Sequence, residues 1–492
     1  MAAKIPDMEK PSYGDKTPIA ATATPLAESA LALVRTSGGG VNSTECSAVQ
    51  LLSKVFSRPE ELFSAEGNTI VHGWIIEPDT KEKLDEVVVS VYRSPKSYTG
   101  EDSADISLHG GIATVKAVMA ALKKAGFRDA LPGEFTFRAF LNGKLDLTRA
   151  ESVMELVSAK THKGREQAIR RLSGVLEKEI TEIKNLLVEV LTGTEIFLDY
   201  SEDEFLDPEN DEEAGRLPAR NLAQEAERKL KAISDLWNTE RLYAEGALLV
   251  LAGRPNAGKS SLFNYLLRED RSIVTESPGT TRDWIEALIS IEGIPLRLAD
   301  TAGLREIDHT EGNEAEKIGM ERSLELIDKA DIVLYLIDGI QGFTKDDRDF
   351  LQKTNAASPE KILVPVWNKN DIASPPLSIK DDLPPQLIPI SAKTGEGIGN
   401  LLSSITGLLE KKASPECSGT NTAGPGTLRQ KELIDSALSS VNEALLLADK
   451  MEPLDIIAPL FRSAVFALGE ITGEVSNADI LEAMFSRFCV GK

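Results

Sequence analysis

The sequence GRPNAGKS at residues 253–260 limits the folds open to this chain more than any other feature. It matches the G-x-x-x-x-G-K-[ST] pattern of loops that hold phosphate groups with backbone N–H groups. The apolar run ALLVLA precedes it and the helical pattern SLFNYLL follows it, which is the strand–loop–helix context that such a loop requires. Strand, loop and helix patterns alternate from residue 247 to about 412, so this segment is predicted to form a parallel α/β sheet.

Helical patterns lie on both sides of this α/β segment. Apolar residues recur at three- and four-residue spacing, with few helix breakers, at residues 147–200 and at about 219–241, 428–450, 454–470 and 477–487. A Ser/Gly/Pro-rich linker at residues 413–427 precedes the last three of these stretches. Because a domain can be inserted where its own ends lie close together, we expect one discontinuous all-α helical domain that carries the α/β domain as an insertion.

The first 143 residues differ in character from the helical stretches. Short β-type runs such as NTIVHGWII and DEVVVSVYR alternate with turns, which predicts an α+β domain. The chain is therefore predicted to be multidomain, with an N-terminal α+β domain at 1–143, the first part of the helical domain at 144–245, a P-loop α/β domain at 246–412, and the second part of the helical domain with the terminal FCVGK at 413–492.

The charge of the chain restricts its partners. Lys and Arg number 55 against 78 Asp and Glu, and the formal net charge of −23 repels phosphate backbones. A nucleic acid must therefore meet a local basic face or arrive with a partner. The basic stretch at 159–172 is either such a face or an ordinary solvated helix face. The acidic run at 201–213 is interpreted as a solvated loop, with metal binding as the alternative.

Cysteine is scarce, and the apolar runs are short. Cys46, Cys417 and Cys489 are widely spaced, which gives no disulfide framework and no metal-ligand cluster. The start of the chain has no apolar leader, and runs such as IVLYLI at 332–337 are far shorter than a membrane span. We therefore expect a soluble, cytoplasmic protein that does not enter a membrane.

Two further motifs, SPGTTRD and ADTAG, would complete the phosphate end of a nucleotide site. Lys259 is expected to reach the β and γ phosphates, and Ser260 to bind Mg²⁺. Thr281 could complete the Mg²⁺ shell from the first motif. In the second motif, Asp300 is placed for a Mg²⁺-bound water and the Gly303 amide for the γ-phosphate.

The last two motifs, NKND at 368–371 and SAK at 391–393, would hold the base. Asp371 can accept two hydrogen bonds from the ring N–H and exocyclic amino group of guanine, a donor pattern that adenine lacks. All five motifs follow strands in order, at the sheet edge where such folds bind ligands, so the sequence predicts a GTPase. The expected GTP-binding residues are Asn256, Ala257, Gly258, Lys259, Ser260, Ser261, Thr275, Glu276, Ser277, Pro278, Gly279, Thr280, Thr281, Asp300, Thr301, Ala302, Gly303, Asn368, Lys369, Asp371, Ser391, Ala392 and Lys393.

The residue after the D-x-x-G motif departs from Ras-like enzymes. Those enzymes place a Gln there, which orients the attacking water. This chain has Leu304, whose apolar side chain cannot orient a water. Hydrolysis therefore needs another polar group and another source of positive charge.

The chain resembles the MnmE/TrmE family of tRNA modification GTPases over nearly its whole length. The resemblance is carried by PGEFTFRAFLNGKLDLTRAESV at 132–153, the GTPase motifs, DTAGLRE and the terminal FCVGK. It implies that an aminomethyl or carboxymethylaminomethyl group is added to carbon 5 of the wobble uridine of certain tRNAs. It also implies an FAD-containing partner, MnmG/GidA, which would join a homodimer of this chain in a heterotetramer.

The resemblance further implies that the N-terminal domain is similar to folate-binding domains, mediates dimerisation and holds a tetrahydrofolate one-carbon donor such as 5-formyltetrahydrofolate. The folate contacts of the family correspond to Arg35, Asp105, Lys144 and the terminal Lys492. Asp105 departs from the family pattern, which has Glu, a side chain one methylene longer.

The resemblance also implies which groups take over the role of the missing glutamine and supply the positive charge. In the family the G domains dimerise across the nucleotides, and K⁺ supplies the positive charge. Asn256 corresponds to the K⁺-binding asparagine of the family, and its amide oxygen suits a hard cation. Thr275, Ser277 and Thr280 would add further oxygens. The catalytic carboxylate corresponds to Glu316, which would orient water through a second water; Glu314 is the alternative, because the preceding segment is longer than in the family.

Two other functions fit the GTPase motifs. One is an Era-like ribosome-assembly GTPase, a class that usually carries a basic RNA-binding module. The other is a mechanical GTP-driven dimer without modification chemistry. The first does not explain the acidic charge and the N-terminal domain, and the second leaves LNGK and FCVGK without a purpose.

The C-terminal tail does not match a prenylation signal, because Gly491 and the charged Lys492 occupy its last two positions. A helix is predicted over 476–488, with Ser476 as N-cap. We expect it to dock on the helical domain through its apolar stripe, which consists of Ile480, Leu481, Met484, Phe485 and Phe488. Docking would hold the tail at a defined place, and the resemblance implies that this place is against the folate-binding domain, where Cys489 either lies near the chemistry or packs as a small hydrophobe.

Overall fold

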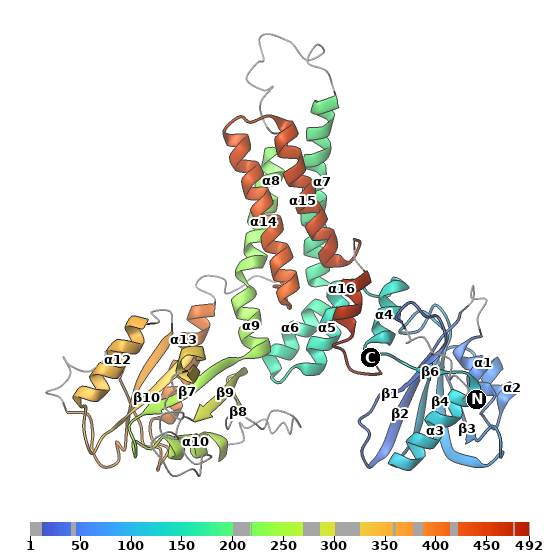
Figure 1. Ribbon diagram of the computed structural model, residues 1–492, viewed down its shortest axis with the longest axis horizontal. Helices are drawn as coiled ribbons and strands as arrows, with labels where there is room; N and C mark the ends of the chain where they lie inside the picture. Colours follow the sequence, from blue (N-terminus) through green and yellow to red (C-terminus); the bar gives the residue numbers. More distant parts are fainter. Residues whose placement is uncertain are drawn as a thin grey trace, which may run out of the picture. The chain divides into compact units, whose positions relative to one another are not determined.

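The computed structural model divides into two compact units, residues 1–154 with 465–492 and residues 155–464 (Figure 1). It describes residues 12–40, 46–199, 217, 219–268, 286–300, 325–357, 361–376, 387–413, 422–475 and 478–491. Within these ranges, no helix has both the length and the apolar character needed to cross a membrane.

The first unit is built on a six-stranded sheet. Its strands are, in spatial order, β3 (Thr69–Ile76), β4 (Lys83–Tyr92), β5 (Ser103–Gly110), β2 (Ser29–Ser37), β1 (Ile19–Thr22) and β6 (Arg128–Asp129). All neighbours pair antiparallel except β1 and β6, which are parallel. Alternate residues of β4 are buried, and this face packs with α1 (Ala48–Ser53), α2 (Pro59–Ser64) and α3 (Ile112–Ala125). The expected α+β character of this segment is confirmed.

The two ends of the chain meet in a second core of the first unit. Helices α4 (Glu134–Leu141), the start of α5 (Leu147–Ser158) and α16 (Ala478–Phe485) surround it. Its buried side chains are Tyr13, Phe137, Leu147, Ala150, Leu481, Phe485 and Phe488. Full burial of one such aromatic side chain contributes about 1.5–3 kcal/mol, so the terminal helix is firmly held.

The terminal helix differs from its prediction in two respects. It ends at Phe485 rather than Phe488, because the backbone N–H of Phe488 turns back to the carbonyl of Phe485. Ile480 is 48% exposed and therefore does not belong to the buried stripe. The helix packs against α4 and the start of α5. Because α5 lies in the segment expected as the first part of the helical domain, docking on that segment is confirmed. Ser476 lies outside the described residues.

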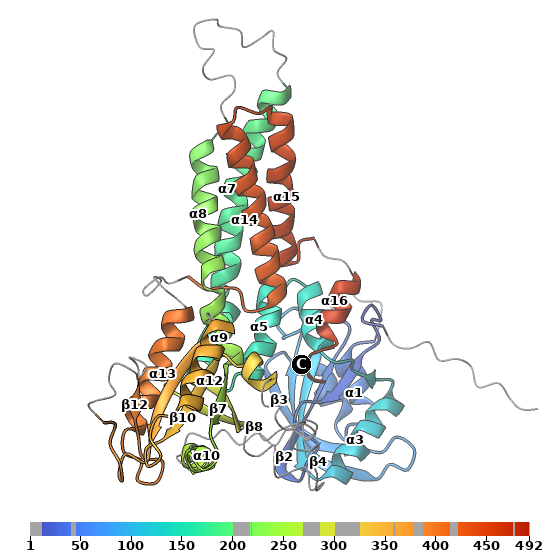
Figure 2. The same cartoon turned by 60° about the vertical axis from the view of Figure 1, so that its left-hand side comes forward.

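The second unit combines long helices from both sides of the α/β segment. Its helices are α6 (His162–Leu172), α7 (Val175–Asp199), α8 (Arg220–Asp235), α9 (Trp237–Glu245), α14 (Leu428–Asp449) and the first part of α15 (Leu454–Thr472). Helix α8 packs against both α7 and α14, and these helices run side by side with α15 (Figure 2). The segment expected as a single helix at about 219–241 forms two helices, α8 and α9, because the helix is interrupted at Leu236.

The α/β segment forms a six-stranded sheet in the same unit. The strand order is β12 (Ile388–Pro389), β11 (Ile362–Asn368), β10 (Ile332–Asp338), β7 (Ala247–Gly253), β9 (Ile294–Asp300) and β8 (Glu286–Ile291). Only β8 runs antiparallel to its neighbour. Both faces are covered, by α10 (Lys259–Arg268) and α13 (Ile398–Ala413) in one core cluster and by α12 (Lys345–Ala357) in another. The predicted parallel α/β sheet is confirmed.

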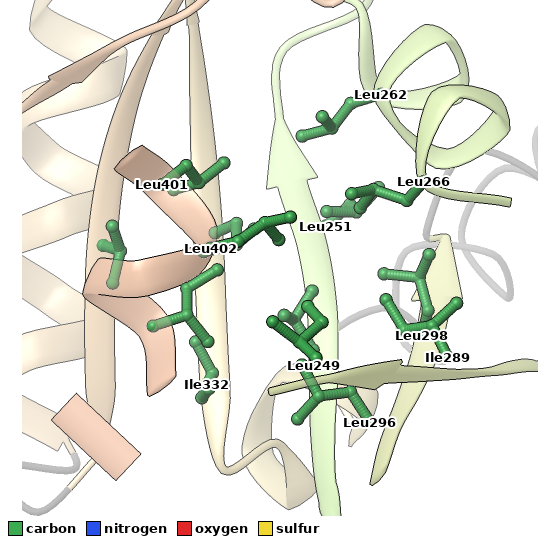
Figure 3. Packing of buried hydrophobic residues seen from close by; sticks show 14 of the residues in the cluster. Leu249, Leu251, Leu262, Leu266, Ile289, Leu296, Leu298, Ile332, Leu401 and Leu402 are labelled. Carbon is green, nitrogen blue, oxygen red and sulfur yellow. The ribbon is translucent and has the colours of Figure 1, made fainter. Parts of the chain in front are cut away.

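The central strand β7 shows why this sheet reads as an apolar run in the sequence. Six of its seven residues are buried, because a parallel strand covered on both faces has no solvent side. Leu249 and Leu251 of β7 pack with Leu262 and Leu266 of α10 and with Leu402 of α13 (Figure 3). This packing fixes the point where β7 ends and α10 begins, which is the position of the phosphate-binding motif.

Candidate functional site

The phosphate-binding motif forms a tight loop between β7 and α10. Gly253 and Gly258 have positive φ values of 139° and 94°, which glycine adopts without steric cost. The Lys259 ammonium turns back into the loop and donates to the carbonyls of Gly253 at 2.9 Å and Arg254 at 3.0 Å. Asn256, at the tip, has a φ of 63° and an exposed side chain. The loop thus keeps the positively charged Lys259 ammonium close to its backbone groups, as a phosphate site requires.

Asn368 joins the phosphate-binding loop to both base motifs. Its side-chain N–H donates to the carbonyl of Ala257 at 2.7 Å, and its side-chain oxygen accepts from the backbone N–H of Ala392 at 3.0 Å. A Cβ on Gly258 would lie 2.1 Å from the Asn368 amide nitrogen, so the loop has room only for glycine there. One buried amide therefore connects the GKS, NKND and SAK motifs.

The remaining base-motif residues lie around this amide. Lys369 donates to the Asp338 carboxylate at 2.7 Å. Burial alone would raise the pKa of Asp338, but the Lys369 hydrogen bond and the Ile340 backbone N–H outweigh it and hold that pKa below its ordinary value. Ser391 is buried, and its hydroxyl accepts from the Thr394 backbone N–H at 3.1 Å. Asp371 and Lys393 have exposed side chains.

Asp338 was missed by the sequence interpretation. Its signal was its place at the end of the apolar strand IVLYLID, where Asp300 ends β9 in the same way. The backbone of Asp300 pairs with Leu251 of β7, so the first residue of the DTAG motif lies beside the end of the strand that leads into the phosphate-binding loop. The side chain of Asp300 and the predicted residues at 275–281 and 301–303, together with Leu304, Glu314 and Glu316, lie outside the described residues.

A second constellation lies in the first unit, on the sheet formed by β2 and β5. Arg35 and Asp105 face each other across these strands, with Nε and Oδ1 3.0 Å apart. The Arg35 guanidinium lies 5.7 Å from the ring centroid of Tyr98 and 5.9 Å from that of Phe135. Its Nη1 donates to the carbonyl of Gly491 at 3.4 Å. Residues far apart in the sequence thus surround one partly exposed ion pair.

The terminal segment is held in place residue by residue. The backbone N–H of Gly133 donates to the carbonyl of Cys489 at 3.2 Å. Gly491 has a φ of 90°, and a Cβ there would lie 2.7 Å from the carbonyl oxygen of Thr22. The Cys489 side chain is exposed, so the alternative of a packed hydrophobic thiol is wrong. Lys492 lies outside the described residues.

Lys144 reaches the same side of the first unit. Its ammonium donates to the carbonyl of Pro95 at 3.0 Å, and its side chain is exposed. Pro95 lies in the loop between β4 and β5 that also carries Tyr98, the aromatic neighbour of Arg35. Of the four expected folate contacts, Arg35 and Asp105 touch directly and Lys144 is linked to them through this loop.

The basic stretch at 159–172 is partly a structural feature. Arg171 is 1% exposed and pairs with Glu155 at 2.6 Å and Glu240 at 2.7 Å. Lys163 pairs with Glu410 at 2.8 Å. Arg171 is therefore a buried structural residue and not part of a surface for RNA, whereas the Lys163 side chain is 37% exposed. Cys417 and the acidic run at 201–213 lie outside the described residues, and those that are described contain no group of three His, Cys, Asp or Glu side chains arranged to hold a metal ion.

Comparisons with known proteins cover almost the whole chain. The family model for the MnmE helical domain matches residues 147–489, and the model for the GTP-binding protein TrmE N-terminus matches residues 18–144. The tRNA modification GTPase MnmE of Treponema denticola is 43% identical over 98% of this chain and 99% of its own length. The protein of the same name from Borreliella afzelii is 40% identical over 96% of this chain and 98% of its own length.

A crystal structure of an Era variant from Aquifex aeolicus with GDP and AlF₄⁻ aligns with 39% of this chain and 66% of its own, at 24% identity and a TM-score of 0.27, which is too low to support an inference. The sequence relatives suffice, because they are similar along both units and include the N-terminal segment that ordinary GTPase domains lack. The chain belongs to the MnmE family of tRNA modification GTPases.

Proposed function

We propose that this GTPase acts with an FAD-containing partner, MnmG/GidA, to add an aminomethyl or carboxymethylaminomethyl group to carbon 5 of the wobble uridine of certain tRNAs. A tetrahydrofolate such as 5-formyltetrahydrofolate supplies the one-carbon unit. The protein works as a cytoplasmic homodimer that joins its partner in a heterotetramer. The observation that carries this proposal is the contact of the terminal segment with Arg35, because it gives the FCVGK tail a place beside an ion pair of the N-terminal domain.

The residues around Arg35 fit a folate. A pterin ring needs flat apolar surfaces and a carboxylate that accepts from its ring N–H and amino groups, whereas the glutamate tail needs cations. Tyr98, which is 39% exposed, provides an aromatic surface, whereas Phe135 is completely buried beside Arg35; Asp105 keeps a side-chain exposure of 20%. Lys144 and Lys492 are proposed as the cations. Arg35 donates to both carboxylate oxygens of the shorter Asp105, from Nε to Oδ1 at 3.0 Å and from Nη2 to Oδ2 at 3.5 Å, and so fixes the position of the carboxylate.

GTP and Mg²⁺ are assigned to the loop between β7 and α10. Lys259 exchanges its two carbonyl partners for the β and γ phosphates, and Ser260, which opens α10 with it, offers its hydroxyl to Mg²⁺. Asp371 reads guanine, and its exposed carboxylate is accessible to a base. Thr281, Asp300 and Gly303 are proposed to complete the site around the metal and the γ-phosphate.

K⁺ is proposed as the source of positive charge in place of an arginine finger. Asn256 is exposed at the loop tip, and its side-chain oxygen belongs to the ligand type that hard cations prefer. Thr275, Ser277 and Thr280 would supply the other oxygens, and Glu316 would orient water in place of the glutamine that Leu304 replaces. When bound, K⁺ supplies charge stabilisation to the developing negative charge on the phosphates.

The experiment that tests the modification is nucleoside analysis of tRNA from cells that lack this gene, with the wild-type gene restored as control. Loss of the modified wobble uridine on deletion and its return on restoration are expected. Unchanged wobble uridines together with a ribosome-assembly defect would replace this proposal by the Era-like switch.

The folate assignment has its own test, which is the removal of residues 489–492. We expect weaker binding of 5-formyltetrahydrofolate by isothermal titration and no loss of GTP-analogue binding, because the two sites use different residues. Unchanged folate affinity would show that the tail does not belong to the folate site.

A further inference from the structure

Arg254, the second residue of the GRPNAGKS loop, directs its side chain out of the loop to helix α12. Its Nε donates to Asp347 Oδ1 at 3.0 Å, and its Nη2 donates to the carbonyl of Gly342 at 3.2 Å. The Asp347 side chain is completely buried and that of Arg254 is 21% exposed. The phosphate-binding loop is therefore tied to a helix that carries none of the five GTPase motifs.

Asp347 is a fully engaged buried carboxylate. Besides Arg254, its Oδ1 accepts from the Tyr335 hydroxyl at 2.8 Å, while its Oδ2 accepts from the backbone N–H and the hydroxyl of Thr344, both at 2.8 Å. Burial, with the nearby Asp347 carboxylate, raises the pKa of Tyr335 above its ordinary value, so this hydroxyl stays a donor at neutral pH. Four donors from three elements fix the position of this one side chain.

The backbone of Arg254 carries the other half of the connection. Its carbonyl accepts from the Ala257 backbone N–H at 3.3 Å and from the Lys259 ammonium at 3.0 Å. Between them, Asn256 is held at a φ of 63°, a conformation that residues other than glycine keep only where the surroundings enforce it. Arg254 therefore closes the turn that contains Asn256 through its backbone carbonyl, while its side chain is bound to Asp347 of α12.

We propose that Asp347 is a positioning residue for GTP hydrolysis, which acts through Arg254 to hold the Asn256 turn in the geometry that binds the activating cation. This inference rests on the proposed role of Asn256 as K⁺ ligand. An ordinary helix-capping role predicts something different. Asp347 at the third position of α12 bonds to Thr344 as in a capping box, and loss of a cap alone lowers stability without changing the response to K⁺.

The test compares three variants of the full-length protein. Asp347→Asn keeps the size of the side chain and can still accept from Thr344. Arg254→Met removes the other partner and leaves the Thr344–Asp347 cap in place. Asp346→Asn is the matched control, because it removes the same charge from the same first turn of α12 at an exposed position. GTP hydrolysis is measured against K⁺ concentration, alongside GTP-analogue affinity and thermal unfolding.

We expect Asp347→Asn and Arg254→Met each to raise the K⁺ concentration for half-maximal activation by about 10–100-fold, the usual effect of losing a group that supports a metal ligand. GTP-analogue affinity should change much less. The double variant should be no worse than the more impaired single variant, because the two residues act as one unit. Asp346→Asn should match the wild type.

An unchanged K⁺ response in both single variants would overturn the inference, as would effects that add in the double variant. The wild-type curve is read separately: hydrolysis that is equally fast in Na⁺ and K⁺ would refute the proposed K⁺ role itself. Should Asp347→Asn fail to fold, Arg254→Met decides the matter, because it leaves the buried carboxylate with its Tyr335 and Thr344 partners.

Discussion

Asn368 offers the sharpest test of how the nucleotide site is assembled. Replacing it by Ala removes both hydrogen bonds of its amide and leaves the carbonyl of Ala257 and the N–H of Ala392 without these partners. Asn368 is 2% exposed, Ala257 is 0% exposed and Ala392 is 7% exposed, so water does not readily replace the lost amide. Each unsatisfied buried group costs about 1–3 kcal/mol, which gives about 2–6 kcal/mol for the two.

The penalty should appear in nucleotide binding, because the phosphate-binding loop must keep this conformation to hold GTP. Even the lower bound of about 2 kcal/mol corresponds to a Kd for a GTP analogue that is about 30-fold higher. Fluorescence titration with a labelled GTP analogue measures it. Asn368→Asp should also fail, since it keeps the acceptor for Ala392 but turns an oxygen towards the carbonyl of Ala257.

Asn370→Ala is the matched control for this prediction. It removes the same side chain two residues further on, where the amide makes an exposed contact of 3.5 Å with Glu396. We expect its Kd to stay near the wild-type value. An Asn368→Ala protein that binds the analogue as tightly as the Asn370→Ala protein would refute the argument that this amide couples the motifs.

Three further outcomes follow from single residues. Gly491→Ala should weaken 5-formyltetrahydrofolate binding in calorimetry, because a φ of 90° costs a non-glycine residue about 1–2 kcal/mol and the Cβ meets backbone; Val490→Ala, which is exposed, should not. Asp371→Asn should weaken binding of a GTP analogue by about 1–3 kcal/mol in the same titration, through one mismatched hydrogen bond. Asp85→Asn should lower the pKa of His109 in an NMR titration, because the hydrogen bond that the His109 ring donates to the Asp85 carboxylate raises that pKa. The stabilisation from this pair is complete below the unfolded pKa of about 6.5 and is lost as the pH rises through the raised folded value.

The sequence was sufficient to predict those parts of the nucleotide site that depend on residues close together in the chain. The GRPNAGKS loop needs glycine at positions with positive φ, and its flanking apolar and helical patterns place it between a buried strand and a helix. The link between the GKS, NKND and SAK motifs was also accessible, because each of them follows a strand and parallel strands end at a common edge. Motif order therefore predicted the site before any contact was known.

Contacts between residues that are far apart in the chain could not be predicted from the sequence. Arg254 and Asp347 are 93 positions apart; the Thr344-x-x-Asp347 spacing fits a capping box, but nothing in the sequence indicates that Asp347 also binds the phosphate-binding loop. The break at Leu236 was equally hidden, because no glycine or proline marks it and the apolar spacing continues across it. The prediction that Ile480 is buried was wrong for a related reason: its spacing fitted the apolar stripe, but the short α16 buries a narrower face.

Arg171 shows how the described ends of both connections to an inserted domain can be fixed to its host. Glu240 lies on α9, which leads into β7, whereas Gly424 lies in the segment that leads from the α/β domain back to α14. Arg171 donates to the Glu240 carboxylate at 2.7 Å and to the Gly424 carbonyl at 3.4 Å, and the other oxygen of Glu240 accepts from the Gly424 N–H at 3.3 Å.

The described end of the Ser/Gly/Pro-rich segment is therefore not a solvated linker, because Ala423 is completely buried against this group. The entry and exit of the α/β domain meet at one buried guanidinium, which satisfies the requirement that the ends of an inserted domain lie close together. A buried charge is costly unless it is paired, and Arg171 gains its pairing only when Glu155, Glu240 and the exit segment are all in place. These ion pairs consequently favour the arrangement in which the entry segment with Glu240 and the exit segment with Gly424 both contact Arg171. This explains why a basic residue in an apparent surface stretch belongs to the core.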